Sequence, residues 1–347
     1  MRIRLILPDV KTYASSGPGE CPYCHGHVLH IHQRLSRRVI DPQVDQVQVV
    51  RWKCTECGRS FRHYPEGVSR KQQSKRLEVV AAILWGLGLS LAWASQVLEI
   101  FGVGVGKTTV WRDVQEAGQV LRSRNRWPGV VRVVGADETL FKVRGREVSV
   151  GFVVGEKGEL IGFDLLTGRD AQSFEEWLRG YVQGLEVEVV VTDDLATYKP
   201  VLEELGVEQQ LCLAHVRKNL ARRLKGIEGY AREKERLRQI VKELPPDGGE
   251  QLVDLEWALA REGERGKKLK AVVIYIAQRW RQLTCFLRRE GVPSTNNPCE
   301  RAIGRSKIRY KTMRGYKSDQ GMLHGIALTQ WLGSGAQEYR LEELLVA

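Results

Sequence analysis

Apolar and polar positions along the chain follow two different periods. Between Val28 and Lys53 they largely alternate, which is typical of paired strands. From Ser74 to Arg124 the apolar residues recur at helical spacing and predict three helices, the second with Ser90 as its N-cap. These helices are expected over residues 74–88, 90–102 and 107–124.

Residues 131–215 combine strand and helix patterns in the order βββαβαβ. Three β-rich runs separated by glycine-containing turns predict an antiparallel meander, and two further strands alternate with helices. In this arrangement Asp137 ends the first strand and Asp193 follows the fourth. Both side chains are therefore expected on neighbouring strands at one edge of the sheet.

The composition is that of a globular protein with a polyanionic partner. The 347 residues suggest two or three folding units, and 42% hydrophobic with 28% charged residues argues against global disorder. The net charge of +12 is uneven, about +9 over residues 1–130, −8 over 131–215 and +11 over 216–347. Basic segments on either side of an acidic centre favour nucleic acid, or else an anionic membrane, as the partner.

The cellular location is predicted from the cysteines and from the start of the chain. Seven cysteines cannot all pair, and the chain begins without a charged-then-apolar signal segment, so that reduced thiols in the cytoplasm are expected. The uncharged run from Val79 to Leu98 is long enough to cross a bilayer. Its internal glycine and polar residues favour two buried helices that meet near Gly88–Ser90, and no membrane partner is expected.

Two CxxC pairs lie in the first sixty residues, Cys21 with Cys24 and Cys54 with Cys57. Four thiolates form the tetrahedral ligand set that Zn²⁺ prefers, and a glycine follows closely after each pair. The 29 residues between Cys24 and Cys54 exceed the usual spacing of roughly 15–20, which a longer hairpin could absorb. A structural zinc ribbon over residues 1–70 is therefore predicted, with the nearby histidines as surface or strand residues.

The third expected helix has a polar face that includes Arg112 and Gln115. Together with the two helices before it, this helix predicts a helix-turn-helix over residues 71–127 that presents polar groups to a DNA major groove. An ordinary three-helix packing domain is the alternative. The preceding GVGVGKTT segment is not a complete nucleotide-binding P-loop, because the position that requires glycine is Phe101.

Asp137 and Asp193 repel each other if they are brought together. Such a pair persists at low cost only when a cation lies between the carboxylates, so a divalent metal site is predicted. Asp194 adjoins Asp193 and is the alternative ligand, whereas strand alternation should turn Glu138 elsewhere. The alternative interpretation of each aspartate alone is a turn or N-cap residue.

A third carboxylate, Glu300, lies near the start of a further expected helix. Asn297 suits the N-cap and Pro298 the first helical position, so Glu300 has a second interpretation as a capping-box glutamate. Its position close to the acidic segment and amid positive charge makes it a candidate metal ligand. The basic residues that follow are candidate DNA contacts, namely Arg301, Arg305, Lys307, Arg309, Lys311 and Arg314.

The ordered set of Asp137 in VVGADET, Asp193 in VVTDDLATY and Glu300 in TNNPCERAIGRSK resembles the catalytic triad of bacterial insertion-sequence DDE transposases. Cys212 and His215 resemble a CxxH motif that several such families carry after the last core strand, and they are candidate residues close to the site. The resemblance implies an α/β (α+β) fold, with an RNase H-like mixed-sheet core over residues 128–347. Within it, residues 216–290 resemble an α-helical insertion.

The same resemblance implies a transposase that cleaves and transfers DNA strands at insertion-sequence ends. Its carboxylates would hold Mg²⁺ or Mn²⁺, and its thiolates Zn²⁺. The expected partners are double-stranded DNA, as terminal inverted repeats and target, and further copies of the chain in a dimer or larger assembly. The alternative is a non-catalytic DNA-binding regulator that kept the ribbon and the helix-turn-helix; an ATPase is a more distant alternative.

Overall fold

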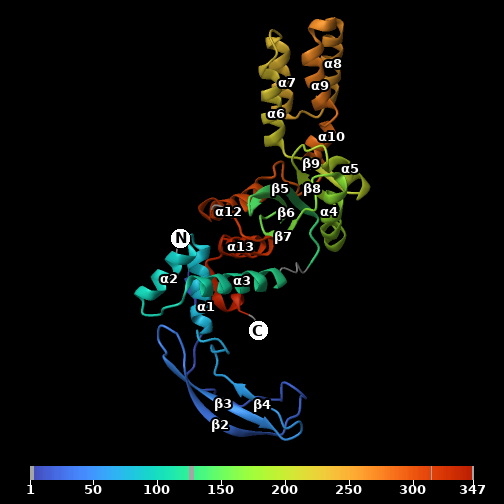
Figure 1. Cartoon of the computed structure of the whole chain (residues 1–347). Coiled ribbons are helices and arrows are strands. Elements are labelled where there is room, and N and C mark those ends of the chain that lie inside the picture. Colours follow the sequence, from blue (N-terminus) through green and yellow to red (C-terminus); the bar gives the residue numbers. More distant parts are fainter. Residues whose placement is uncertain (1–3, 125–128, 314, 346–347) are drawn as a thin grey trace. The chain divides into compact units, whose positions relative to one another are not determined.

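The computed structural model describes residues 4–124, 129–313 and 315–345 (Figure 1). The chain folds as two compact units. One consists of Met1–Arg126 together with Arg305–Ala347, and the other of Trp127–Gly304. The boundary between the units falls within helix α12 (Asn297–Met313).

The first unit begins with a long β-hairpin and a short third strand (Figure 1). Strands β2 (Leu29–Arg38), β3 (Gln46–Cys54) and β4 (Ser60–His63) form an antiparallel sheet in that order. Val47 and Val49 of β3 are buried in a small apolar cluster. The hairpin accounts for the wide spacing between the two cysteine pairs, as the sequence predicted.

Three helices follow, α1 (Lys75–Gly86), α2 (Leu91–Ile100) and α3 (Lys107–Arg124). The hydroxyls of Ser74 and Ser90 cap the first two, each accepting a hydrogen bond from the backbone N–H three residues ahead. The prediction of two helices that meet near Gly88–Ser90 is confirmed. Over the described ranges, no helix combines the length and apolar character needed to span a bilayer.

The C-terminal residues complete this first unit. Helix α13 (Asp319–Leu332), strand β10 (Glu338–Arg340) and the short helix η2 (Leu341–Leu344) share an apolar cluster with α1 and α3. Strand β10 pairs in parallel with β1 (Arg4–Ile6). The sequence predicts a catalytic domain that extends to residue 347, whereas residues from Arg305 onward group with the N-terminal unit. The reason is their apolar packing on α1 and α3, which no local pattern shows.

The second unit contains a five-stranded mixed sheet with the order β7-β6-β5-β8-β9. Strands β5, β6 and β7 are antiparallel, and β8 and β9 run parallel to β5, so the sheet has the RNase H-like order that was expected. The strands are β5 (Val133–Val143), β6 (Arg146–Gly155), β7 (Leu160–Leu165), β8 (Val189–Thr192) and β9 (Glu208–Leu211). Strand β5 continues six residues past Asp137, which therefore lies inside the strand rather than at its end.

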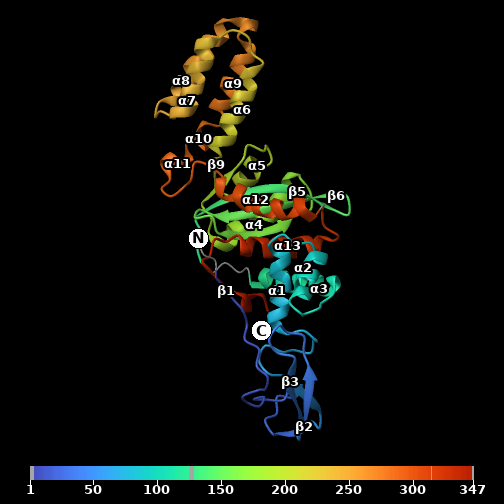
Figure 2. The ribbon, with the colours of Figure 1, turned by 90° about the vertical axis from the view of Figure 1, so that its left-hand side faces the viewer.

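Alternate residues of the central strands face opposite sides of this sheet. On one side, Val134 and Val190 pack with helix α4 (Ala171–Leu185) and α5 (Tyr198–Glu204), and Figure 2 shows α4 lying along the sheet. On the other side, Val133, Val189 and Val191 pack against Cys285 and Val292. This alternation decides which acidic residues can meet.

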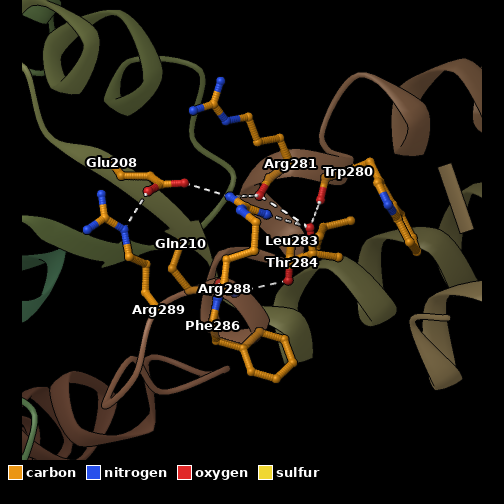
Figure 3. Close-up of polar contacts among 9 residues, drawn as sticks. All are labelled: Glu208, Gln210, Trp280, Arg281, Leu283, Thr284, Phe286, Arg288 and Arg289. Atoms are coloured by element: carbon orange, nitrogen blue, oxygen red, sulfur yellow. Dashed lines mark hydrogen bonds and ion pairs between the residues drawn. The ribbon is translucent and has the colours of Figure 1, made fainter. Parts of the chain in front are cut away.

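Helices form an insertion between β9 and α12, yellow to orange in Figure 1, with its own apolar core. They are α6 (Leu213–Lys225), α7 (Ala231–Glu243), α8 (Gly248–Arg261), η1 (Gly263–Arg265), α9 (Lys267–Ala277), α10 (Trp280–Leu283) and α11 (Cys285–Arg288). The end of the insertion is fastened to β9 by polar contacts (Figure 3). Gln210 accepts a hydrogen bond from Phe286 N–H (2.8 Å), and Glu208 forms ion pairs with Arg288 (2.6 Å) and Arg289 (3.2 Å).

Arg309 was predicted to contact DNA, but its side chain is buried. The guanidinium donates to the carbonyl oxygens of Gly88 (3.0 Å) and Leu89 (2.7 Å) and lies 4.4 Å from the centre of the Trp85 ring. Only 4% of the residue is exposed. Arg309 therefore satisfies carbonyls of the turn between α1 and α2, and the prediction of a DNA contact at this residue is wrong.

We expect Arg309→Ala to destabilise the first unit by about 2–4 kcal/mol, because two carbonyls of the α1–α2 turn lose their charged donor and a buried side chain is removed. Thermal unfolding followed by circular dichroism measures the effect. Lys311→Ala is the matched control, since Lys311 is exposed on the same helix, and it should change stability by less than about 0.5 kcal/mol. Equal stability of the two variants would contradict the structural role of Arg309.

Candidate active site and metal centre

The two CxxC pairs converge on one point in the first unit. Cys21 Sγ lies 3.7 Å from Cys57 Sγ, and Cys24 Sγ lies 3.7 Å from Cys54 Sγ. Four sulfurs bound to Zn²⁺ at about 2.3 Å form a tetrahedron with edges of about 3.8 Å, so the arrangement fits this ion. Burial opposes ionisation of Cys21, but the backbone N–H groups of Tyr23 and Cys24 lower the pKa of its thiol to about 7.

Each pair ends in a tight turn with a left-handed residue directly after its second cysteine. This residue is Gly58 (φ 70°) in the second turn, but His25 (φ 59°) in the first, one position earlier than the glycine noted in the sequence. His25 pairs with Glu20, and the rings of His27 and His63 bond to backbone carbonyls. The side chains of these three histidines thus bond to groups other than the four cysteines.

The second unit brings two aspartates together through strand register. Strands β5 and β8 pair in parallel, and their pairing ends with Gly135 opposite Val191. Asp137 lies two residues further along β5, and Asp193 lies two residues after Val191, directly past the end of β8. The odd-numbered residues Val133, Val189 and Val191 face away from α4. Asp137 and Asp193 continue this odd-numbered series, so their side chains are expected on the same side of the sheet. The backbone N–H of Leu195 donates to Asp193 (3.0 Å) and fixes the turn after β8.

Glu138 points to the opposite side of the sheet, as expected from strand alternation. Its carboxylate accepts a hydrogen bond from the Tyr198 hydroxyl (2.9 Å) and lies 3.5 Å from Arg169. Only its backbone N–H reaches the aspartate pair, through a 2.9 Å bond to Asp137. Adjacent carboxylates thus have separate roles because successive strand residues alternate.

Glu300 is brought to this site by the start of α12. The side-chain amide of Asn296 donates to the Ala136 carbonyl (2.9 Å), directly before Asp137. A side chain at Gly135 would collide with Asn296, since a Cβ there would lie 2.3 Å from its oxygen. The missing side chain at Gly135 lets α12 approach the strand.

The start of α12 differs by one residue from the prediction. The Glu300 N–H bonds to the Asn296 carbonyl (3.1 Å), so Asn296, not Asn297, holds the N-cap position. Glu300 is then the fourth helical residue, one beyond the capping-box position. The capping interpretation of Glu300 therefore loses its geometric basis.

The acidic residues of the site act on one another electrostatically. Burial, followed by the negative charges of Asp193 and Glu138 and a smaller contribution from Glu300, raises the pKa of Asp137 to about 7. Burial and the charges of Asp137 and Glu300 also raise the pKa of the Cys299 thiol far above its usual value. Hard oxygen ligands under mutual repulsion fit a divalent cation such as Mg²⁺ or Mn²⁺.

Asp194, the alternative ligand, is occupied by the helical insertion. Arg279 Nε donates to its carboxylate (2.7 Å), and the Tyr275 hydroxyl donates to the other oxygen. The Tyr275 ring lies between two guanidiniums, with Arg279 at 4.0 Å and Arg223 of α6 at 4.1 Å from its centre. These contacts favour Asp193 over Asp194 as the site carboxylate and give Asp194 an anchoring role.

Cys212 and His215 lie beside Glu300. The His215 Nε2 atom is 3.6 Å from a Glu300 oxygen, and the Cys212 sulfur accepts a hydrogen bond from the Asn296 N–H (3.3 Å). The ligand atoms of Cys212, His215 and Glu300 all lie within 4.8 Å of one another.

The candidate DNA contacts are unequal in exposure. Arg112, Arg301 and Lys311 are exposed, whereas Lys307 is partly buried over the Tyr310 ring. Arg305 is half-buried and bonds to Gln330 (3.1 Å). Arg314 lies outside the described residues.

Gln115 was predicted to face DNA, but it faces helix α13. Its side-chain oxygen bonds to His324 Nδ1 at 3.0 Å, and the residue is half-buried. The exposed face of α3 is therefore narrower than the sequence indicated, because α13 packs on this helix.

Sequence reasoning missed the residues that hold the site together, above all Asn296, Gly135, Tyr275 and Arg279. A doubled asparagine before a proline was the only local signal for Asn296. Tyr275 and Arg279 are four residues apart on one helix, but their common partner is more than eighty residues away in the chain for each.

A mixed sheet of this order, with acidic residues gathered beside its central parallel strands, places the protein in the RNase H-like class. The chain matches the family described as Transposase IS66 family over residues 77–323, and it belongs to this family. A search of curated proteins gives no match.

Two of the solved structures that match the chain contain viral integration proteins. A chain of the cryoEM structure of simian T-cell lymphotropic virus intasome in complex with PP2A regulatory subunit B56 gamma is 13% identical, with a TM-score of 0.23, over 42% of this chain and 58% of that one. The protein thus spans less than two thirds of that chain. The catalytic core domain of BIV integrase is 13% identical, with a TM-score of 0.20, over 52% of this chain and 98% of that one.

We expect Cys54→Ser to lose tightly bound zinc and to unfold the hairpin locally, because three thiolates hold Zn²⁺ much more weakly than four. Metal analysis after dialysis and limited proteolysis of the hairpin measure both effects. His27→Ala is the control, since this ring bonds to a backbone carbonyl, and it should retain the ion. Full zinc retention by Cys54→Ser would refute the four-cysteine site.

Replacing Asp137 by Asn should stabilise the metal-free protein at pH 8 by roughly 1–2 kcal/mol but change little near pH 4. The raised pKa means that the folded state binds more protons than the unfolded state between about pH 4 and 7. The wild-type protein therefore loses stability as the pH rises through this window, and the variant does not. Chemical denaturation in EDTA at both values tests this, and an equal gain at both would contradict it.

Proposed function

We propose that the protein is a catalytically active transposase that cleaves and joins DNA strands at the ends of an insertion element. The observation that carries this proposal is the Asn296 bond to the Ala136 carbonyl, which sets the start of the helix that carries Glu300 beside the strand that carries Asp137, while Asp193 follows the neighbouring strand. Membership of a transposase family supports it. A regulator that only binds DNA has no need for this costly arrangement of charges.

Asp137, Asp193 and Glu300 are the residues that would hold divalent ions. Bound there, a pair of Mg²⁺ or Mn²⁺ ions supplies Lewis-acid activation of an attacking oxygen and stabilisation of a leaving oxygen. The chain contributes the orientation of these carboxylates. Strand register sets the two aspartates, and the Asn296 bond to the Ala136 carbonyl sets the start of the helix that carries Glu300.

The remaining elements supply binding to DNA. Arg301 directly follows Glu300 and is exposed, so it is well placed to neutralise a phosphate next to the site. Arg112 on α3 and Lys311 on α12 offer further exposed cations, and the cysteine cluster would hold a structural Zn²⁺ in the N-terminal ribbon. Transposition joins two element ends, so we infer a dimer or larger assembly on DNA.

The decisive experiment is a strand-nicking assay on DNA that carries the element's terminal repeats, with Mg²⁺ or Mn²⁺. We expect the wild-type protein to nick, and Asp137→Asn, Asp193→Asn and Glu300→Gln each to lose at least about a hundredfold in rate while DNA affinity changes little. Electrophoretic mobility shift measures the affinity.

Glu138→Gln is the matched control, because it removes a neighbouring carboxylate that faces the opposite side of the sheet. It should retain nicking within a few-fold of the wild-type rate. Nicking by Asp137→Asn at the wild-type rate would refute the proposed site, and DNA binding without nicking by the wild-type protein would favour the regulator.

A further inference from the structure

Cys212 and His215 converge because of their positions at the start of helix α6. The Val216 N–H bonds to the Cys212 carbonyl (3.1 Å), so Cys212 is the N-cap residue and His215 the third helical residue. These are the two positions whose side chains meet in a capping box. A CxxH sequence at a helix N-terminus therefore brings a sulfur and an imidazole to one place.

The start of α12 brings a third ligand to the same place. The Leu213 N–H donates to the Ser294 carbonyl (2.9 Å), and the Asn296 N–H donates to the Cys212 sulfur (3.3 Å). These two bonds join the beginnings of α6 and α12, so Glu300 lies beside His215. The cluster is held by backbone contacts rather than by chance proximity of flexible side chains.

The chemistry of the sulfur favours a soft metal ion. Cys212 is fully buried at the start of a helix, and its sulfur accepts a hydrogen bond from a backbone N–H, so the position of this soft ligand atom is fixed. His215 Nδ1 has no hydrogen-bond partner among the described residues, although the atom is buried. Sulfur, nitrogen and oxygen ligands within 4.8 Å suit Zn²⁺, which takes three protein ligands and a water in open sites.

We propose that Cys212, His215 and Glu300 form a second zinc site, separate from the four-cysteine site, whose occupation by Zn²⁺ switches the transposase off. Zinc binding releases the Cys212 proton to solvent and engages the Glu300 carboxylate. Glu300 is then withdrawn from the set that it forms with Asp137 and Asp193. Mg²⁺ does not compete well for this cluster, because it disfavours thiolate ligands.

The binding part of this proposal stands on the cluster alone, whereas its regulatory part rests on the proposed function. The first measurement is therefore zinc stoichiometry of the full chain in zinc-buffered solution. We expect two ions per wild-type chain, one per chain for Cys212→Ala and for His215→Ala, and two for Asp137→Asn. Cys285→Ala is the control, because this buried cysteine of the same unit lies outside the cluster and should leave two.

A count of two for both Cys212→Ala and His215→Ala would overturn the site. So would a count of one for Asp137→Asn, since the second ion would then belong to the aspartates. Circular dichroism of each variant confirms its fold, and His215→Ala, which alters a half-exposed residue, serves if Cys212→Ala does not fold.

The second measurement is zinc inhibition of nicking at fixed Mg²⁺. The concentration of free Zn²⁺ that halves the rate should rise at least tenfold in Cys212→Ala, and Cys285→Ala should behave as wild type. Unchanged inhibition in Cys212→Ala would refute the switch. Absence of nicking by the zinc-free wild-type protein in Mg²⁺ would instead refute the proposed function, and the stoichiometry would still decide whether the site exists.

Discussion

Repulsion among acidic side chains is the constraint on which the second unit depends. Asp137 lies on β5 and Asp193 directly follows the neighbouring parallel strand β8, and burial together with the charge of Asp193 raises the pKa of Asp137 to about 7. A protein keeps such an arrangement only if the backbone imposes it and a bound ligand offsets the free energy of repulsion. Here strand register imposes it, and the apolar packing of both sheet faces fixes the register, because a one-residue slip would move every side chain of the strand to the opposite face and turn Asp137 towards α4.

The third carboxylate depends on a different kind of contact. Register cannot bring Glu300 to the sheet, since it lies on a helix more than a hundred residues further along the chain. Instead, a buried amide, Asn296, bonds to the carbonyl before Asp137, and a glycine in the strand leaves room for it. Close packing without a side chain at Gly135 thus matters as much for the site as the acidic residues themselves. The same helix start touches Cys212, so one short segment joins the carboxylate set to the sulfur and imidazole of α6.

The helical insertion is tied to the core at two places, and both bear on the site. Gln210 and Glu208 of the edge strand hold its last helices, while Asp194 binds Tyr275 and Arg279 from α9. Because Asp194 follows Asp193 directly, a movement of the insertion relative to the sheet would displace the turn after β8. The double aspartate in the sequence therefore combines two tasks, one residue facing the site and the next anchoring the insertion.

Local patterns in the sequence determined the elements and the chemical character of the candidate sites. The spacing of apolar residues predicted the strands and helices, and the two CxxC pairs predicted the sulfur cluster, because these features depend on neighbours in the chain. Tertiary structure alone decided what each polar side chain contacts. Arg309 and Gln115 look like DNA contacts in the sequence but are held by the α1–α2 turn and by α13, and residues after Arg305 pack on the N-terminal helices. The partner of a side chain depends on which distant segments of the chain fold beside it, and the spacing of apolar residues along the sequence carries no information about those segments.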